Sequence, residues 1–174
     1  MNTKVLVSLA LLVGMGAVLH AVIPPIFLGM KPDMMLTMMF LGIMLFPQAR
    51  SVLVLAIATG AIAALTTSFP NGQVANMIDK PLTAFLFLGL FLAVRRYKQS
   101  VVSAAVLTAI GTIVSGMIFL AAALALGSFS AAQFFGLVAA VVLPATAVNM
   151  FAMIVIYPIV QTIVKRSKIT SQMS

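Results

Sequence analysis

Long apolar runs separated by short polar segments extend over almost all of the 174 residues of the chain. A helix that crosses a membrane needs roughly 17–25 apolar residues, and runs of about that order recur along the sequence. Six candidate spans can be delimited: Val5–Ile23, Met34–Phe46, Ser51–Thr67, Leu82–Val94, Val101–Leu126 and Ala131–Val164. The pattern predicts an all-α membrane protein with one transmembrane domain over residues 1–174, built as a bundle of six transmembrane helices.

Turn and cap signals fall between these runs. Phe69–Gly72 reads Phe-Pro-Asn-Gly, which is a strong turn signal after the third run. Ser130 and Gln133 have the spacing of a capping box at the start of the last run. Pro144 and Pro158 predict bends within that run, since proline removes a helical hydrogen bond.

The short run Met34–Phe46 could be a re-entrant piece, so the charges are needed to count the crossings. If six segments cross, eight of the ten basic residues share one side: Lys4, Arg50, Arg95, Arg96, Lys98, Lys165, Arg166 and Lys168. Lys31 and Lys80 then face the other side. If Met34–Phe46 did not cross, the ten would divide five to five. Because basic residues gather on the cytoplasmic side, six crossings with both termini cytoplasmic are favoured.

Composition excludes a sizeable water-soluble domain. Hydrophobic residues make up 63% of the chain and charged residues 7%, and the mean hydropathy is +1.24. The net charge of +8 comes from loops that orient the protein in the lipid bilayer, so no nucleic-acid partner is expected. One histidine, two aspartates and no cysteine cannot supply a metal-ligand set, and no cofactor is predicted.

Polar side chains gather at the predicted outer end of the bundle. Both acidic residues, Asp33 and Asp79, lie there beside Lys31 and Lys80. Such pairs could hold the ammonium and the carboxylate of a zwitterion within apolar walls. The same charges could equally be solvated loop residues, and Asp79 could favour the positive N-terminus of the fourth helix. Further candidate binding residues are His20, Asn71, Gln73, Asn76 and Asn149.

Several of these candidates also have a structural interpretation. His20, near the outer end of the first helix, is more often a packed or interfacial residue than a ligand. The presence of Asn71 is explained in part by a turn, because asparagine followed by glycine is typical of turns. Asn149 lies within the last run, where an amide faces the bundle interior and either contacts substrate or bonds a neighbouring helix. The structural role is slightly preferred for Asn149.

Small residues follow one face of the first helix. Ala10, Gly14, Ala17 and Ala21 are spaced so that another helix can approach closely. That helix could belong to this chain, which is the usual case, or to another protein.

Enzymatic and ATP-hydrolysing motifs are missing from the sequence. It contains no GxxxxGK[ST] phosphate loop, no series of acidic residues within the spans for a proton relay, and no evident nucleophile and base pair. The chain is therefore not expected to be an enzyme.

Five segments resemble the tryptophan transporter family: His20–Pro25, Gly29–Leu36, Asn76–Pro81, Val142–Ala145 and Tyr157–Ile163. That family is similar to the substrate-binding S-components of energy-coupling-factor (ECF) transporters. The resemblance implies a six-helix fold of ECF S-component type with a substrate pocket near the outer face. It also implies partners, namely a transmembrane coupling protein and two ABC-type ATPases. S-components commonly meet the coupling protein through an Ala-xxx-Ala-like motif, here Ala10 to Gly14.

The resemblance predicts a membrane protein that binds tryptophan on the outer side and delivers it inward within an ATP-driven complex. The alternatives are an ion-coupled secondary carrier of an aromatic amino acid and a membrane subunit that transports nothing. Lys31 or Lys80 would hold the substrate carboxylate, and Asp33 or Asp79 its ammonium. Met and Phe side chains would form the apolar slot. Acceptors for the indole N–H would come from Asn71, Gln73, Asn76 or His20.

Overall fold

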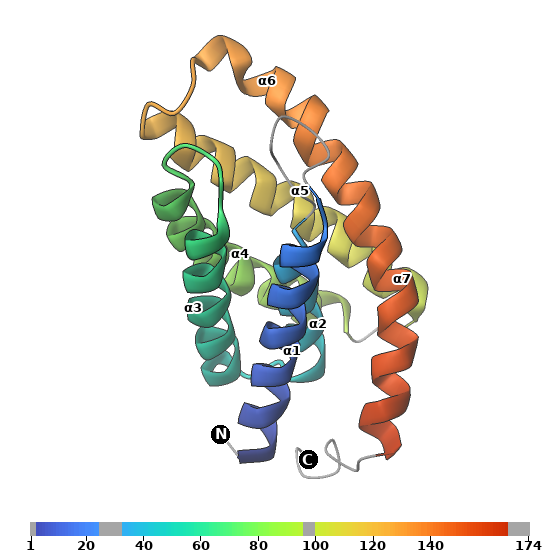
Figure 1. The fold of residues 1–174 in the computed structure, drawn as a ribbon. Coiled ribbons are helices and arrows are strands. Elements are labelled where there is room, and N and C mark those ends of the chain that lie inside the picture. Colours follow the sequence, from blue (N-terminus) through green and yellow to red (C-terminus); the bar gives the residue numbers. More distant parts are fainter. Residues whose placement is uncertain (1–2, 25–32, 96–99, 167–174) are drawn as a thin grey trace.

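The computed structural model describes residues 3–24, 33–95 and 100–166, with no side chains described for residues 165 and 166. The described residues are helical and contain no strand, which confirms the all-α prediction (Figure 1). The long helices are α1 (Thr3–Val22), α3 (Ala49–Thr66), α4 (Gly72–Val94), α5 (Val101–Ala125) and α7 (Leu143–Arg166). The shorter helical elements are α2 (Met34–Leu45), η1 (Ala131–Gln133), α6 (Phe134–Leu137) and η2 (Val138–Val142).

Local sequence signals account for several helix ends. Asp33 caps α2 by accepting a hydrogen bond from the backbone N–H of Leu36 at 3.0 Å. Ser100 forms a reciprocal capping box with Ser103 at the start of α5. The predicted Ser130–Gln133 box is also present, and it starts η1.

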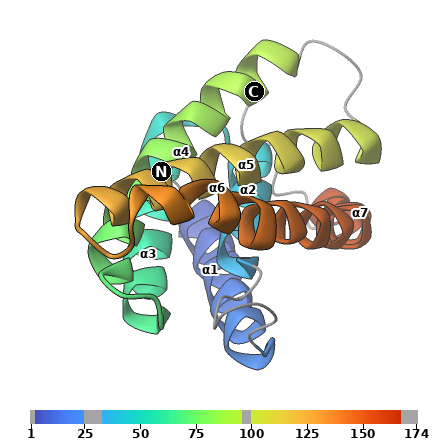
Figure 2. The ribbon, with the colours of Figure 1, turned by 90° about the horizontal axis from the view of Figure 1, so that it is seen from above.

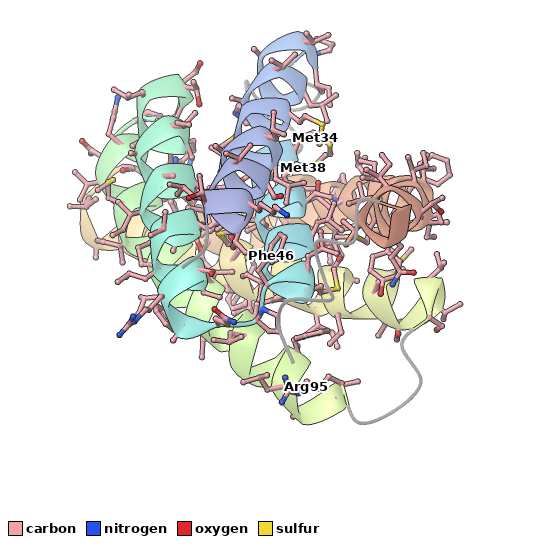
Figure 3. All side chains as sticks on the ribbon, turned by 90° about the horizontal axis from the view of Figure 1, so that it is seen from below. Met34, Met38, Phe46 and Arg95 are labelled. Carbon is pink, nitrogen blue, oxygen red and sulfur yellow. The ribbon has the colours of Figure 1, made fainter. Side chains whose placement is uncertain are left out.

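Helix α2 lies at the centre of the bundle. All its residues from Met34 to Met44 are buried, and it contacts α1, α3, α4, α5 and α7. Figure 3 shows Met34, Met38 and Phe46 along this segment among the surrounding helices. Twelve residues of helix span about 18 Å, well below the roughly 30 Å of a bilayer core. Five helices are therefore long and apolar enough to cross a membrane, and α2 is an enclosed sixth.

Aromatic stacking joins α2 to its neighbours. Phe40 of α2 stacks on Phe87 of α4 with ring centroids 4.0 Å apart. Both rings press against Gly111 of α5, where an added Cβ would lie 2.7 Å from Phe40 and 2.8 Å from Phe87. Glycine therefore permits the close approach of these three helices.

The fourth helix begins ten residues earlier than the sequence predicted. The expected span was Leu82–Val94, whereas α4 starts at Gly72 and continues through Pro81. The prediction read the polar stretch before Pro81 as an outer loop. In the structure three of its polar side chains, Asn76, Asp79 and Lys80, are buried on the inner face of the helix. Asp79 is two turns inside α4, so it does not interact with the helix N-terminus.

The last predicted span is divided into several elements. A 3-10 turn and one turn of α-helix lead into the π-helical segment η2, and α7 follows with Pro144 in its first turn. Figure 2 shows this succession crossing over the end of the bundle. Val142 of η2 fills the space beside Gly116 of α5, where an added Cβ would lie 2.6 Å from its side chain. The π-turn thus fixes how the last helix packs on α5.

The ends of several helices share one end of the molecule. In Figure 1, α1 and α3 begin and α7 ends at the lower end of the bundle. Lys4 and Arg50 lie in the first turns of α1 and α3. This arrangement agrees with an even number of crossings.

Candidate functional site

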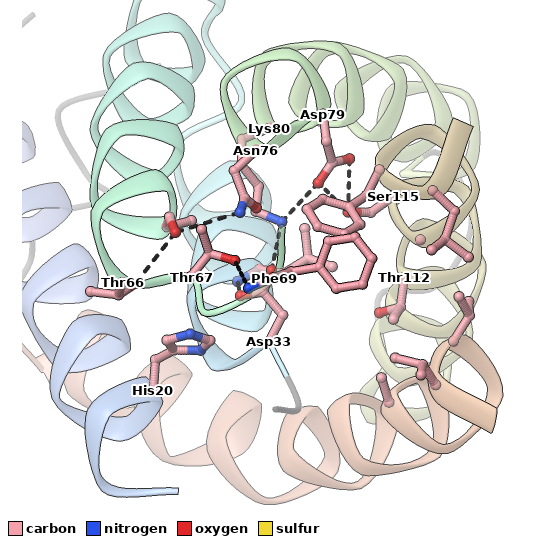
Figure 4. A pocket seen from close by; sticks show the side chains of 18 of the residues that line it. His20, Asp33, Thr66, Thr67, Phe69, Asn76, Asp79, Lys80, Thr112 and Ser115 are labelled. Atoms are coloured by element: carbon pink, nitrogen blue, oxygen red, sulfur yellow. Dashed lines mark hydrogen bonds and ion pairs between the residues drawn. The ribbon is translucent and has the colours of Figure 1, made fainter. Parts of the chain in front are cut away.

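A hollow runs between the upper parts of the helices. Its lining comes from α1, α2, α3, α4, α5, η2 and α7, together with the turn between α3 and α4. The cavity measures about 870 Å³ when the space at its open mouth is included. Figure 4 shows its labelled side chains, which combine hydroxyls, an amide and four ionisable groups with the phenyl ring of Phe69.

Three charged side chains form one network at the wall of this cavity. The Lys80 ammonium lies 2.5 Å from Asp33 Oδ2 and 2.8 Å from Asp79 Oδ2. Lys80 and Asp79 are consecutive residues of α4, and Asp33 is the cap of α2. The network therefore ties two helices together and carries one more negative than positive charge.

Asp79 is the fully enclosed member of the network. Its side chain has no exposed surface, and it accepts hydrogen bonds from Thr83 at 2.7 Å and from Lys80 at 2.8 Å. The Ser115 hydroxyl of α5 approaches both of its oxygens, at 2.9 and 2.8 Å. Three donors of the protein thus share the two oxygens of Asp79, and each oxygen has at least one partner.

Asp33 is the accessible carboxylate. Its side chain retains 24% exposure, and its oxygens accept one bond from Leu36 N and one from Lys80. Burial raises the pKa of Asp33, but the charges of Lys80 and His20 and these two hydrogen bonds outweigh burial and hold the pKa below its ordinary value. Asp33 is thus an anion whose carboxylate oxygens can accept further hydrogen bonds.

Two other predicted residues line the cavity. Asn76 donates to the backbone carbonyl oxygens of Gly72 at 2.9 Å and Ala63 at 3.5 Å, so its Oδ1 is the atom that remains to accept a bond. His20 reaches the cavity from the last turn of α1. Lys31, which was also predicted, lies outside the described residues.

The remaining predicted residues lie away from the cavity. Asn71 adopts a left-handed conformation (φ 53°) in the turn before α4 and donates to Leu126 O and Ser128 Oγ. Gln73 is exposed in the first turn of α4. Asn149 is fully buried behind the wall, where it donates to the Thr112 hydroxyl at 3.3 Å. Thr112 itself faces the cavity.

An aromatic wall and several hydroxyl side chains, among them Thr112 and Ser115, were missed by the sequence analysis. Phe69 and Phe119 line the cavity edge to face, with ring centroids 5.5 Å apart. Among twelve phenylalanines nothing distinguished these two. Thr112 and Ser115 did carry a signal, because hydroxyls three residues apart in an apolar helix share a face that tends to point inward.

The cavity therefore has two chemically different parts. The network of Asp33, Asp79 and Lys80 offers a net negative charge, and Phe69 and Phe119 offer an apolar aromatic surface. No group of three or more potential metal ligands occurs among residues 3–24, 33–95 and 100–166. The arrangement suits a small aromatic molecule that carries a charged group.

Comparison with known proteins identifies the family. The model of the family described as "Tryptophan transporter TrpP" matches residues 2–165. The chain belongs to the tryptophan transporter family. It is 57% identical over 171 residues to a "Probable tryptophan transport protein" of Bacillus subtilis, with 96% of each chain covered. Proteins of the same description from Clostridium acetobutylicum and Clostridium perfringens are 38% and 35% identical, covering 86% and 97% of each chain.

Membership of the tryptophan transporter family settles the general class. The chain is a multi-pass membrane protein of a transport family, not an enzyme, and its apolar helices agree with this. No solved structure matches the chain. The fold described above therefore rests on the helices and contacts of this structure.

In this member of the tryptophan transporter family, the small residues of α1 face outward. Ala10 and Gly14 are exposed, and a Cβ added to Gly14 would meet nothing within 4 Å. Ala17 is half-buried against the core. Within the chain, α1 instead approaches α2 through Gly16. A Cβ added there would lie 3.2 Å from side-chain atoms of Met35 and Met38. The stripe is thus not the contact between α1 and its neighbour α2.

Proposed function

We propose that this protein binds tryptophan in the cavity from the outer side of the cell membrane and delivers it inward. The observation that carries the proposal is the pairing of an accessible anion, Asp33, with the aromatic wall of Phe69 and Phe119 in one cavity. Tryptophan has an ammonium and a large aromatic ring, and the relatives at 35–57% identity are named as probable tryptophan transport proteins.

The proposed binding pose follows from the two parts of the cavity. The ammonium of tryptophan would lie against Asp33, and its indole would pack on Phe69 and Phe119. The cavity lies toward the end of the bundle opposite to the start of α1, because its lining includes His20 in the last turn of α1 and the turn between α3 and α4. With six crossings and cytoplasmic termini, that end would face outward.

The energy for uptake would come from partner proteins. The sequence has no phosphate loop for ATP, and the stripe of exposed Ala10 and Gly14 with half-buried Ala17 is the surface we propose for a transmembrane coupling protein. Two ABC-type ATPases would complete an ECF complex, in which this chain is the S-component. An ion-coupled carrier is the competing function.

Two measurements on the full chain separate these possibilities. Purified protein in detergent should bind tritiated tryptophan without any partner, and absence of binding would overturn the proposal. Liposomes containing the chain alone should not accumulate tryptophan under a proton or sodium gradient. Gradient-driven uptake by the chain alone would instead favour the secondary carrier.

A substitution in α1 tests the docking surface. Gly14→Leu adds a bulky side chain to an exposed position with no neighbour within 4 Å, so tryptophan binding by the isolated chain should stay within about twofold. Uptake into cells should fall sharply if a partner helix packs there. Gly89→Leu on α4, equally free of neighbours, is the matched control and should leave uptake intact. Normal uptake by Gly14→Leu would exclude this surface.

A further inference from the structure

We infer that the cavity selects its ligand by the ammonium group, so that an aromatic amine without a carboxylate binds and the corresponding aromatic acid without an amine does not. This inference deepens the proposed function and rests on it. It concerns which half of a zwitterion the protein recognises.

The first argument is the charge of the network. Asp33 and Asp79 face a single lysine, so the three side chains carry a net charge of −1. Among the described residues that line the cavity, Lys80 is the only lysine or arginine, and His20 is the only other residue with a basic side chain. Coulomb interactions strengthen away from water, so an added anion would be repelled here and an added cation attracted.

The second argument is that Lys80 is already used. Its side chain is only 3% exposed, and its ammonium contacts a carboxylate on each of two helices. Taking this ammonium for a substrate carboxylate would leave Asp33 or Asp79 without its counter-charge in a buried site, which is costly. Lys80 therefore serves the network and not the substrate carboxylate.

The third argument is the difference between the two acids. Asp79 is fully enclosed and hydrogen-bonded to Thr83, Ser115 and Lys80. Asp33 receives two bonds, keeps 24% exposure and so retains acceptor sites on the cavity side. The excess negative charge is thus presented to a ligand at Asp33, where an ammonium would give a charge-assisted hydrogen bond.

Competition for bound tritiated tryptophan tests the inference directly. Tryptamine keeps the ring and the ammonium, whereas indole-3-propionate keeps the ring and the carboxylate. We expect tryptamine to compete within about tenfold of tryptophan, and the acid to be weaker than the amine by about thirtyfold or more, the effect of losing one member of a buried charge pair. Equal or stronger competition by the acid would overturn the inference.

A variant assigns the selectivity to Asp33. Asp33→Asn removes the charge but keeps a side chain that caps helices as well as aspartate does, so α2 should remain capped. The ratio of acid to amine affinity should shift by about tenfold or more in favour of the acid. A purely structural role would weaken both analogues alike and leave the ratio unchanged, which would contradict the assignment. Gln73→Glu is the control: it adds a negative charge at an exposed position of α4 and should not alter the ratio.

Thermal shifts with each analogue separate this inference from the proposed function. They do not require labelled tryptophan to bind. Stabilisation by tryptamine alone supports selection by the ammonium even if tryptophan binding fails. Stabilisation by indole-3-propionate alone, or by neither analogue, contradicts it even if tryptophan binds.

Discussion

At the residue scale, the buried ionic network is the feature that decides both stability and binding. Lys80 holds two carboxylates that belong to different helices, and removal of a single partner from such a network leaves a buried charge uncompensated. The sequence placed all three residues at one end of the bundle. It could not show that they face one another, because that depends on α4 starting at Gly72 and turning the side chains of Asp79 and Lys80 inward.

Lys80→Met should destabilise the protein strongly. Methionine preserves the apolar stem but leaves the buried Asp79 and the half-buried Asp33 as neighbouring anions without their counter-charge, so a loss of about 3–5 kcal/mol in the free energy of unfolding is expected. Thermal unfolding in detergent measures it. Arg95→Met removes an exposed cation beyond the end of α4 and should change stability by less than about 0.5 kcal/mol. A similar stability for both variants would contradict the role given to Lys80.

Thr112 is the residue for which we predict a bond to the indole N–H. It lies on the cavity side of α5, two turns before Phe119. Its hydroxyl oxygen accepts a hydrogen bond from the buried Asn149. Thr112→Val should therefore reduce the preference for tryptophan over its benzothiophene analogue, which lacks the N–H, by roughly three- to tenfold. Competition binding gives this ratio.

The same change at Thr108 provides the control for Thr112. Thr108 is on the same helix, and its buried hydroxyl has no hydrogen-bond partner. Thr108→Val should leave the preference unchanged and should not reduce stability. An equal loss of preference in both variants would mean that the effect is general to α5.

At the element scale, hydropathy predicted helices well where they face lipid and poorly where they face the cavity. The first helix was expected over Val5–Ile23 and is observed over Thr3–Val22. The start of α4 was missed because Asn76, Asp79 and Lys80 lower the hydropathy of its first turns. The cavity wall was missed for the opposite reason, since Phe69 and Phe119 resemble every other phenylalanine of the chain. Partial prediction of the site therefore came from its polar members alone.

Gly111→Ala tests the close approach of three helices. The added methyl would lie within 3 Å of Phe40 and Phe87, whose stacked rings are buried in the core. Overpacking of this kind typically costs about 1–3 kcal/mol, which a thermal unfolding curve resolves. Gly89→Ala, at an exposed position of α4 with no neighbour within 4 Å, should be neutral or stabilising. If both substitutions were neutral, the packing described here would be wrong.

At the scale of the whole molecule, the distribution of charge along the bundle gives its orientation. Lys4 and Arg50 lie in the first turns of helices at one end, and the cavity with both acidic residues lies toward the other. The excess of basic residues at the first end favours its placement in the cytoplasm. The sequence predicted this polarity correctly as a pattern, while the membrane side of each end remains a prediction.

Labelling of introduced cysteines tests that orientation, and the chain suits it because it has no native cysteine. Gln73→Cys and Arg95→Cys replace exposed residues at opposite ends of α4. In intact cells, a membrane-impermeant maleimide should label the first variant and should label the second only after permeabilisation. Labelling of both from the same side would refute the crossing of α4 and the outward mouth of the cavity.

The enclosure of α2 has a consequence for how the protein is made. Its twelve residues are too few to be held by the bilayer alone, and every side of the helix is covered by other parts of the chain. During synthesis α2 emerges before α3, α4, α5 and α7, which form most of its surroundings. Nascent α2 must therefore stay in the translocation machinery or against α1 until the later helices have been synthesised. Biogenesis then ends when those helices pack around a helix that was inserted early.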